Sequence, residues 1–199
     1  MAYLAESVQR KLAILSGGGW ITGTLRVAKM PVLIDAIEGI GEFLRLSEVR
    51  LPNTPAPIPF FALHRSSVMY IVPLDDPQRA ETTPFTKPTL IHEVSCLFDQ
   101  GVLSGTLEIL TGMRVSDYLV QRAGFMPVRG CTWHGAAATG APATFPLALV
   151  NRQRVVGVSE SSAELTPRLE IARQKPVTPS AGSSNLVEPT GQPIRPVNT

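Results

Sequence analysis

The sequence predicts a β-rich α+β fold made of two tandem ββαββ repeats related by pseudo-twofold symmetry, followed by a disordered C-terminal tail. Residues 19–49 and residues 101–131 align without a gap at an offset of 82 positions, and apolar residues face apolar residues along the alignment. A repeat of this length indicates that one structural unit occurs twice. The identical pairs are Gly19/Gly101, Gly23/Gly105, Thr24/Thr106, Leu25/Leu107, Asp35/Asp117 and Phe43/Phe125.

Each repeat is expected to begin with a β-hairpin. Residues 93–98 (EVSCLF) alternate between polar and apolar side chains, which is typical of a half-buried strand, and residues 11–16 occupy the same place in the first repeat. Both segments lead into a turn that contains glycine, and a second strand rich in threonine and β-branched residues follows each turn.

A short helix is expected after each hairpin, over Pro31–Glu38 and Met113–Arg122. Pro31 suits the first turn of a helix, and Asp35 and Asp117 place a carboxylate near the positive end of the helix dipole. Helices this short are not stable alone in water, so each must pack on the sheet.

Two further strands complete each predicted unit. The third covers residues 42–51 and 125–133, and the fourth covers residues 60–72 and 145–158, where the offset rises to 87 because the second copy has a longer loop. Large apolar residues that keep the same place in both copies are expected in the core. These are Leu25, Leu107, Phe43 and Phe125.

The domain organisation that follows has four segments. The repeats cover residues 1–73 and 89–159, and the linker at 74–88 holds three prolines and mixed charge. The tail, residues 160–199, has six prolines and no aromatic residue. Such a segment buries too little apolar surface to offset the loss of chain entropy, so we expect it to be disordered.

Composition excludes some functions and suggests a location. Hydrophobic residues make up 44% of the chain, enough for a core, whereas a net charge of +2 is too weak to indicate nucleic acid or an anionic membrane as a partner. The two cysteines have no CxxC spacing, which favours reduced thiols. No export signal or membrane-spanning run is visible, so we expect a cytoplasmic protein without membrane insertion.

Two residue pairs that the repeat places together are candidate functional residues. Arg65 and Arg152 could bind an anion at the pseudo-twofold axis, or each could border a turn or pair with a nearby carboxylate. Asp35 and Asp117 could do acid/base work across the axis, or each could stabilise its own helix terminus.

Other residues argue against a metal, a cofactor or a catalytic set. His64, His92 and His134 lie on separate predicted strands without a partner at i+2 or i+4, so we expect no metal site. The glycines at 17–19 lack the Lys-Ser/Thr of a phosphate-binding loop. The aromatic residues Trp20, Trp133, Phe60 and Phe61 could stack on single-stranded nucleic acid, or they could belong to the core.

Three segments of the second repeat resemble an uncharacterised bacterial domain family. They are residues 113–119 (MRVSDYL), 124–128 (GFMPV) and 150–155 (VNRQRV). The family shows an Arg-x-Ser-Asp-x-Leu helix start, a Phe-x-x-Leu strand and a closing strand of the Val-Asn-Lys-x-x-Ile type. The first repeat departs from it, with Val32 and Ile34 where Arg and Ser are expected. The resemblance implies no known activity and no catalytic residue.

The sequence therefore favours a non-enzymatic scaffold or adaptor of unknown pathway that binds a protein partner or itself. One alternative is a regulatory module that binds a small ligand, with an anion site formed by Arg65 and Arg152 at the axis. Another is a weak nucleic-acid binder that uses Trp20 and Phe61, although we do not expect nucleic acid to be the partner.

Overall fold

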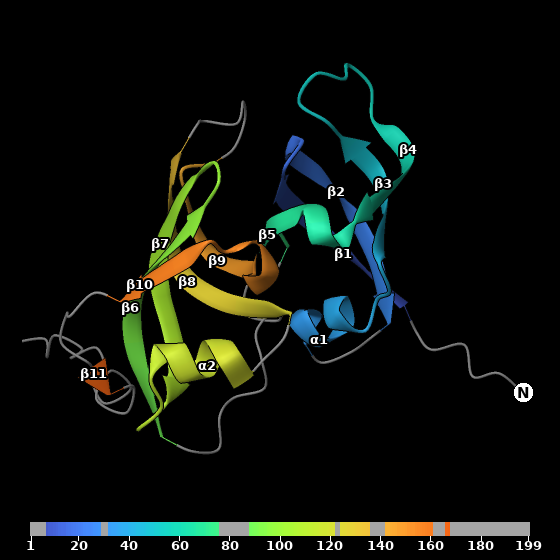
Figure 1. Cartoon of the computed structure of the whole chain (residues 1–199). Coiled ribbons are helices and arrows are strands. Elements are labelled where there is room, and N and C mark those ends of the chain that lie inside the picture. Colours follow the sequence, from blue (N-terminus) through green and yellow to red (C-terminus); the bar gives the residue numbers. More distant parts are fainter. Residues whose placement is uncertain are drawn as a thin grey trace, which may run out of the picture.

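The computed structural model describes residues 7–28, 32–75, 88–121, 124–135, 142–160 and 166–167. Within these residues the strands form one antiparallel sheet, accompanied by two short α-helices and two 3-10 turns (Figure 1). The expectation of a β-rich fold is thus confirmed. We call residues 7–75 the first half and residues 88–160 the second half.

The elements follow one another in the same order in both halves. The first half contains β1 (Ser7–Ser16), β2 (Gly19–Ala28), α1 (Leu33–Glu38), β3 (Phe43–Arg50), β4 (Ile58–His64), the 3-10 turn η1 (Arg65–Ser67) and β5 (Val68–Pro73). The second half contains β6 (Thr89–Phe98), β7 (Gly101–Leu110), α2 (Val115–Gln121), β8 (Phe125–Gly135), β9 (Thr144–Asn151), the 3-10 turn η3 (Arg152–Arg154) and β10 (Gly157–Glu160). A two-residue strand, β11 (Thr166–Pro167), pairs with β6 beyond β10.

The predicted fourth strand of each half is in fact two strands separated by a 3-10 turn. A side chain at the end of the first strand starts the turn in both places. His64 Nδ1 accepts a hydrogen bond from the Ser66 N–H at 3.2 Å, and Asn151 Oδ1 accepts one from the Gln153 N–H at 3.1 Å. The turn sends the chain to a different neighbour, because β4 pairs with β3 whereas β5 pairs with β1.

The sheet order is β10-β6-β7-β8-β9-β5-β1-β2-β3-β4, so each half contributes one continuous block of five strands. Residue pairs across neighbouring strands of the first half recur in the second half at the offsets that align the sequence. The matching pairs are Leu12↔Gly23 with Val94↔Gly105, Thr24↔Ser47 with Thr106↔Arg129, Phe43↔His64 with Phe125↔Asn151, and Ile14↔Ile71 with Cys96↔Val158.

The two blocks meet where β9 pairs with β5, through Tyr70↔Val150 and Ile71↔Leu149. A pseudo-twofold arrangement, as expected from the sequence, would also pair β4 with β10. Among the described strands β4 and β10 lie at opposite ends of the sheet instead, and we call these two strands the free edges.

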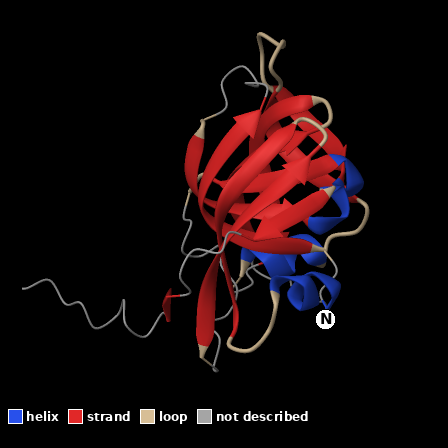
Figure 2. Cartoon of the chain, turned by 60° about the vertical axis from the view of Figure 1, so that its left-hand side comes forward, coloured by secondary structure: helices blue, strands red, loops and turns tan. Residues whose placement is uncertain are grey.

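The central strands are buried on both faces, because two hydrophobic clusters lie on opposite sides of them. Successive side chains of a strand point to opposite faces, and Ala148 and Val150 join one cluster while Leu147 and Leu149 join the other. The first cluster consists mainly of second-half residues, and the second mainly of first-half residues. Figure 2 shows the strands as one strongly curved surface with the helices gathered at one side.

The four expected core residues divide three to one. Leu25, Leu107 and Phe125 are buried, which confirms the prediction. Phe43 was wrongly placed in the core, since 47% of its surface is exposed. It pairs with His64 on the free edge β4, whereas Phe125 pairs with Asn151 on β9, which the first half covers.

Some predicted segments fall wholly or partly outside the described residues. These are the first position of the Pro31–Glu38 helix, the last position of the Met113–Arg122 helix, most of the linker, and most of the tail. Among the residues that the structure does describe, no helix has the length and apolar character required to cross a membrane.

Candidate functional site

The arginines of the two 3-10 turns lie at the ends of the two helices. Arg65 Nη1 donates hydrogen bonds to the carbonyl oxygens of Ile40 at 2.9 Å and Glu38 at 3.2 Å. Arg152 Nη1 donates to the carbonyl oxygen of Tyr118 at 3.0 Å. The last carbonyls of a helix lack partners within the helix and form the negative end of its dipole, so a guanidinium stabilises them.

The same two turns contact each other at the junction between the halves. Buried Asn151 connects them, because its Nδ2 donates to the carbonyl oxygens of Val68 at 2.9 Å and Arg65 at 3.2 Å. The fold therefore brings the segments of Arg65 and Arg152 together and gives each arginine a structural role. Whether the two also bind an anion stays a prediction.

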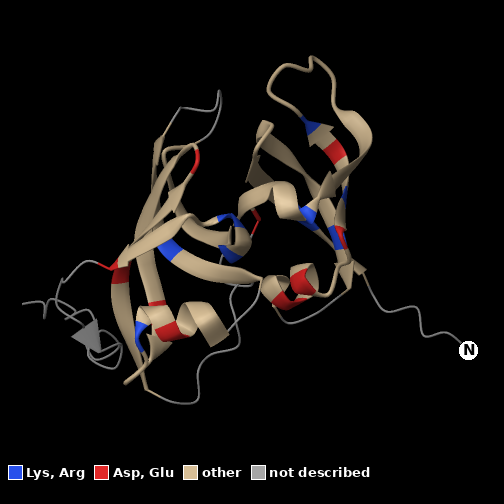
Figure 3. Ribbon diagram, viewed as in Figure 1, with Lys and Arg blue, Asp and Glu red and all other residues tan. Residues whose placement is uncertain are grey.

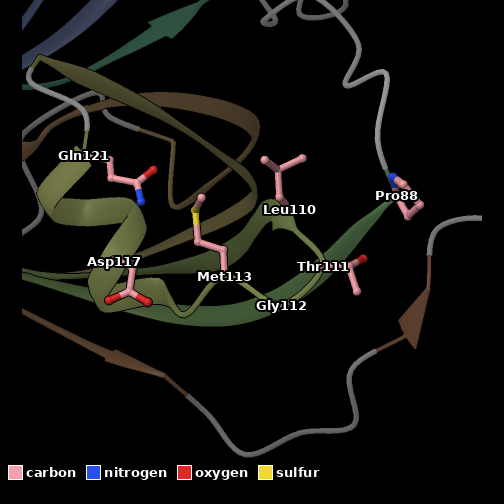
Figure 4. Close-up of a pocket in the computed structure, with 7 residues that line it drawn as sticks. All are labelled: Pro88, Leu110, Thr111, Gly112, Met113, Asp117 and Gln121. Carbon is pink, nitrogen blue, oxygen red and sulfur yellow. The ribbon is translucent and has the colours of Figure 1, made fainter.

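A hollow of about 440 Å³ lies between α2 and the end of the β6–β7 hairpin (Figure 4). Its lining residues are Pro88, Leu110, Thr111, Gly112, Met113, Asp117 and Gln121. Among the described lining residues Asp117 is the one charged side chain.

The other candidates from the sequence are scattered. Asp35 is exposed on α1, while Asp117 lines the hollow in the second half. His64 Nδ1 lies 2.6 Å from Ser66 Oγ, and buried His92 Nδ1 lies 2.5 Å from Glu160 Oε1. No group of three metal-ligating side chains occurs among the described residues.

The two cysteines are buried and free. Burial raises the pKa of Cys96 and of Cys131 to about 12, so both thiols are neutral near pH 7. Cys131 Sγ also donates a hydrogen bond to the Val128 carbonyl oxygen at 3.1 Å. A neutral, enclosed thiol is a poor nucleophile, and these two belong to the core.

The tryptophans are not available as a stacking platform. Trp20 and Trp133 are buried and form ring contacts with Tyr70, to which Phe98 and Phe145 also pack. Figure 3 shows basic and acidic residues interspersed over both halves rather than gathered in a stripe. Arginines pair with carboxylates at Arg10–Asp75, Arg129–Glu108 and Arg154–Asp99, at distances between 3.5 and 3.8 Å.

On or next to the two outermost strands at each end of the sheet lie residues that sequence reasoning missed. Of the large apolar side chains that the structure describes as exposed, Phe43 lies on β3 and Phe60 on β4, while Leu97 lies on β6 and Val156 immediately before β10. The alignment of the two halves would predict that these four side chains are buried, because the residues aligned with them in the other half are buried. Whether these side chains are buried depends on which strands form the edges of the sheet, and a local sequence pattern does not reveal that.

A second hollow, of about 430 Å³, lies beside Phe43. It is lined by residues of β2, β3 and the segment that follows α1: Leu25, Arg26, Ile40, Gly41, Glu42, Phe43 and Arg45. An exposed aromatic ring next to a hollow is a feature of docking surfaces.

No family model, no curated protein and no solved structure matches the chain. The resemblance of the second-half motifs to an uncharacterised bacterial domain family stays a prediction. Function must therefore be argued from the geometry of this molecule.

Proposed function

We propose that this protein is a non-enzymatic scaffold, built from two copies of one unit, that binds protein through the free edges of its sheet. The unit is the ββαββ repeat of the sequence, extended by the strand that follows each 3-10 turn. The support for duplication is that strand order and pairing register agree at the offsets that align the sequence. The two buried thiols are typical of a reducing compartment, so we place the scaffold in the cytoplasm.

One observation carries the proposal: of the six large apolar side chains that are exposed in the described part of the chain, four lie on or next to the two outermost strands at the ends of the sheet. An edge strand presents unpaired backbone N–H and C=O groups and is a ready template for another chain. Natural proteins usually protect such an edge with charge or proline. Although β4 contains Pro59, its Phe60 is 62% exposed, and Phe43, opposite His64 at the other end of the β3–β4 pair, is 47% exposed. An apolar, unpaired edge is suited to binding protein rather than a small substrate.

The candidate sites inside the fold support a non-enzymatic role. The arginines donate to carbonyls at or just after the ends of the helices, and burial keeps the thiols neutral. The arginines and the thiols thus have structural reasons for their places.

The test compares variants of the full chain expressed in its native host and crosslinked in the cell. Phe43→Ser with Phe60→Ser removes the apolar surface of one free edge. Leu74→Ser, which changes a residue of similar exposure away from the edges, is the matched control. We expect the double variant to lose crosslinked protein at least about tenfold relative to wild type and to Leu74→Ser, because buried aromatic anchors dominate interface energies. Identical crosslinked species in all three chains would contradict the proposal.

A further inference from the structure

We propose that the partner at the free edges is a second copy of this chain, with β4 of one molecule pairing antiparallel with β10 of another. This inference rests on the proposed function and deepens it. The new junction would repeat the junction between β9 and β5 that already joins the two halves, since β4 corresponds to β9 and β10 corresponds to β5.

The pairing register follows from the internal junction. There Tyr70 pairs with Val150 and Ile71 with Leu149. The residues aligned with Tyr70 and Ile71 at the offset of 87 are Gly157 and Val158, and those aligned with Val150 and Leu149 are Leu63 and Ala62. The pairs expected between two molecules are therefore Gly157↔Leu63 and Val158↔Ala62. β10 pairs with β6 in the same register as β5 pairs with β1. Val158 lies opposite Cys96, and the aligned residues Ile71 and Ile14 lie opposite each other. The outer side of β10 is therefore placed to pair with β4 as β5 pairs with β9.

The exposed apolar residues agree with this junction one by one. Each has a counterpart that the internal junction buries to 3% exposure or less. The exposed and buried counterparts are Phe43/Phe125, Phe60/Leu147, Leu97/Leu15 and Val156/Met69. Two of the exposed members lie at one end of the sheet and two at the other, so joining the ends would cover all four. Burial of apolar surface is the main favourable term in association.

A helix contact strengthens the correspondence. At the internal junction α1 approaches the start of β8, where Glu38 Oε1 accepts a hydrogen bond from the Phe125 N–H at 3.0 Å. The counterpart of Glu38 is Val120, an 86% exposed apolar residue on α2. In the proposed junction Val120 would reach Phe43 of the neighbouring molecule and the hollow of about 430 Å³ beside it. An apolar contact would thus replace the charged one.

The junction is heterologous, since it joins two different surfaces. Such an interface closes into a ring when the rotation between copies permits and otherwise extends as a filament. Two chains, each giving β4 to the other's β10, would form the smallest ring. Pairing would be short, as it is inside the molecule, because Pro59 on β4 has no N–H to donate, like Pro146 on β9.

The register is tested by crosslinking two differently substituted chains. Ala62→Cys in one full-length chain and Val158→Cys in another place thiols on the proposed pair, and the native thiols are buried. After mild oxidation we expect a disulfide-linked dimer in the mixture, at least about tenfold more than from either chain alone or from Ala62→Cys mixed with Leu74→Cys, because Cβ atoms of directly opposed strand residues lie close enough for a disulfide.

The outcomes separate this inference from the proposed function. A chain that carries both substitutions and forms its disulfide within one molecule at every concentration would show closure of the single chain and overturn the inference. The absence of a mixed dimer would also overturn it. The scaffold proposal would survive either result if the Phe43→Ser, Phe60→Ser chain still lost its crosslinked partners in the cell.

Discussion

Phe43 and Phe125 show how position in the sheet, rather than residue type, decides burial. They occupy the same place in the two halves, but Phe43 is 47% exposed and Phe125 is 3% exposed. Phe125, the first residue of β8, packs in the cluster made mainly of first-half residues, whereas Phe43 on β3 contacts His64 of the free edge β4 edge-on at a centroid distance of 4.9 Å. The pair therefore gives a matched test of the fold.

We expect Phe125→Ala to lower the free energy of unfolding by about 3–5 kcal/mol, because it leaves a cavity in a packed core. Phe43→Ala should change it by less than about 1 kcal/mol when the protein is dilute, since an exposed side chain leaves no cavity. Urea melts of the two variants and wild type measure the difference. Equal losses would show that the two places are equally buried.

The buried thiols make stability depend on alkaline pH. Burial raises the pKa of Cys96 and Cys131 from the ordinary value of 9.0 to about 12. Between these values the unfolded thiols lose protons that the folded thiols keep, so the unfolded state binds fewer protons and stability falls as the pH rises. The contribution of each thiol is fully present below pH 9.0 and is lost as the pH rises through about 12.

Urea melts at about pH 8 and about pH 10 should therefore differ more for wild type than for the Cys96→Ala, Cys131→Ala chain. The comparison uses the change with pH within each chain, so the loss of packing in the variant cancels. A variant that loses as much stability as wild type over this range would contradict the assignment of neutral, buried thiols.

At the scale of elements, the sequence predicts the hairpins and helices but not their neighbours. Alternation in residues 93–98 and the glycine-containing turns locate β6, β7 and their first-half counterparts because these signals are local. The break at residues 65–67 was missed, because a turn started by one His or Asn side chain leaves the apolar pattern nearly intact. Burial at the edges was missed because it depends on which strand lies beside which.

Asn151 joins these elements and offers a second matched pair. Its side chain bonds to the backbone of η1, β5 and its own turn, whereas its counterpart His64 is exposed and bonds only within its turn among the contacts described. We expect Asn151→Ala to cost about 1–3 kcal/mol, because it leaves buried backbone groups without partners, and His64→Ala to cost less than about 1 kcal/mol. Thermal melts of both variants check this, and a larger cost at His64 would contradict the role of Asn151 at the junction.

At the scale of the whole molecule, two halves with the same element order are joined through β9 and β5, and β4 and β10 are the corresponding strands at the two ends of the sheet. The internal junction shows what such ends do when they meet: β9 and β5 pair, and the side chains on both faces become buried. No other described strand pairs with the outer sides of β4 and β10. We therefore expect these two ends to join between molecules.

Amide hydrogen exchange measured over a dilution series tests that claim most directly, because it reports the pairing of the edge backbone itself. We expect amides of residues 61–64 and 157–158 to exchange more slowly as the concentration rises, while those of residues 44–46, inside the sheet, do not change. The Phe43→Ser, Phe60→Ser chain should show no such dependence. Exchange at both free edges that is fast and independent of concentration in wild type would contradict the account.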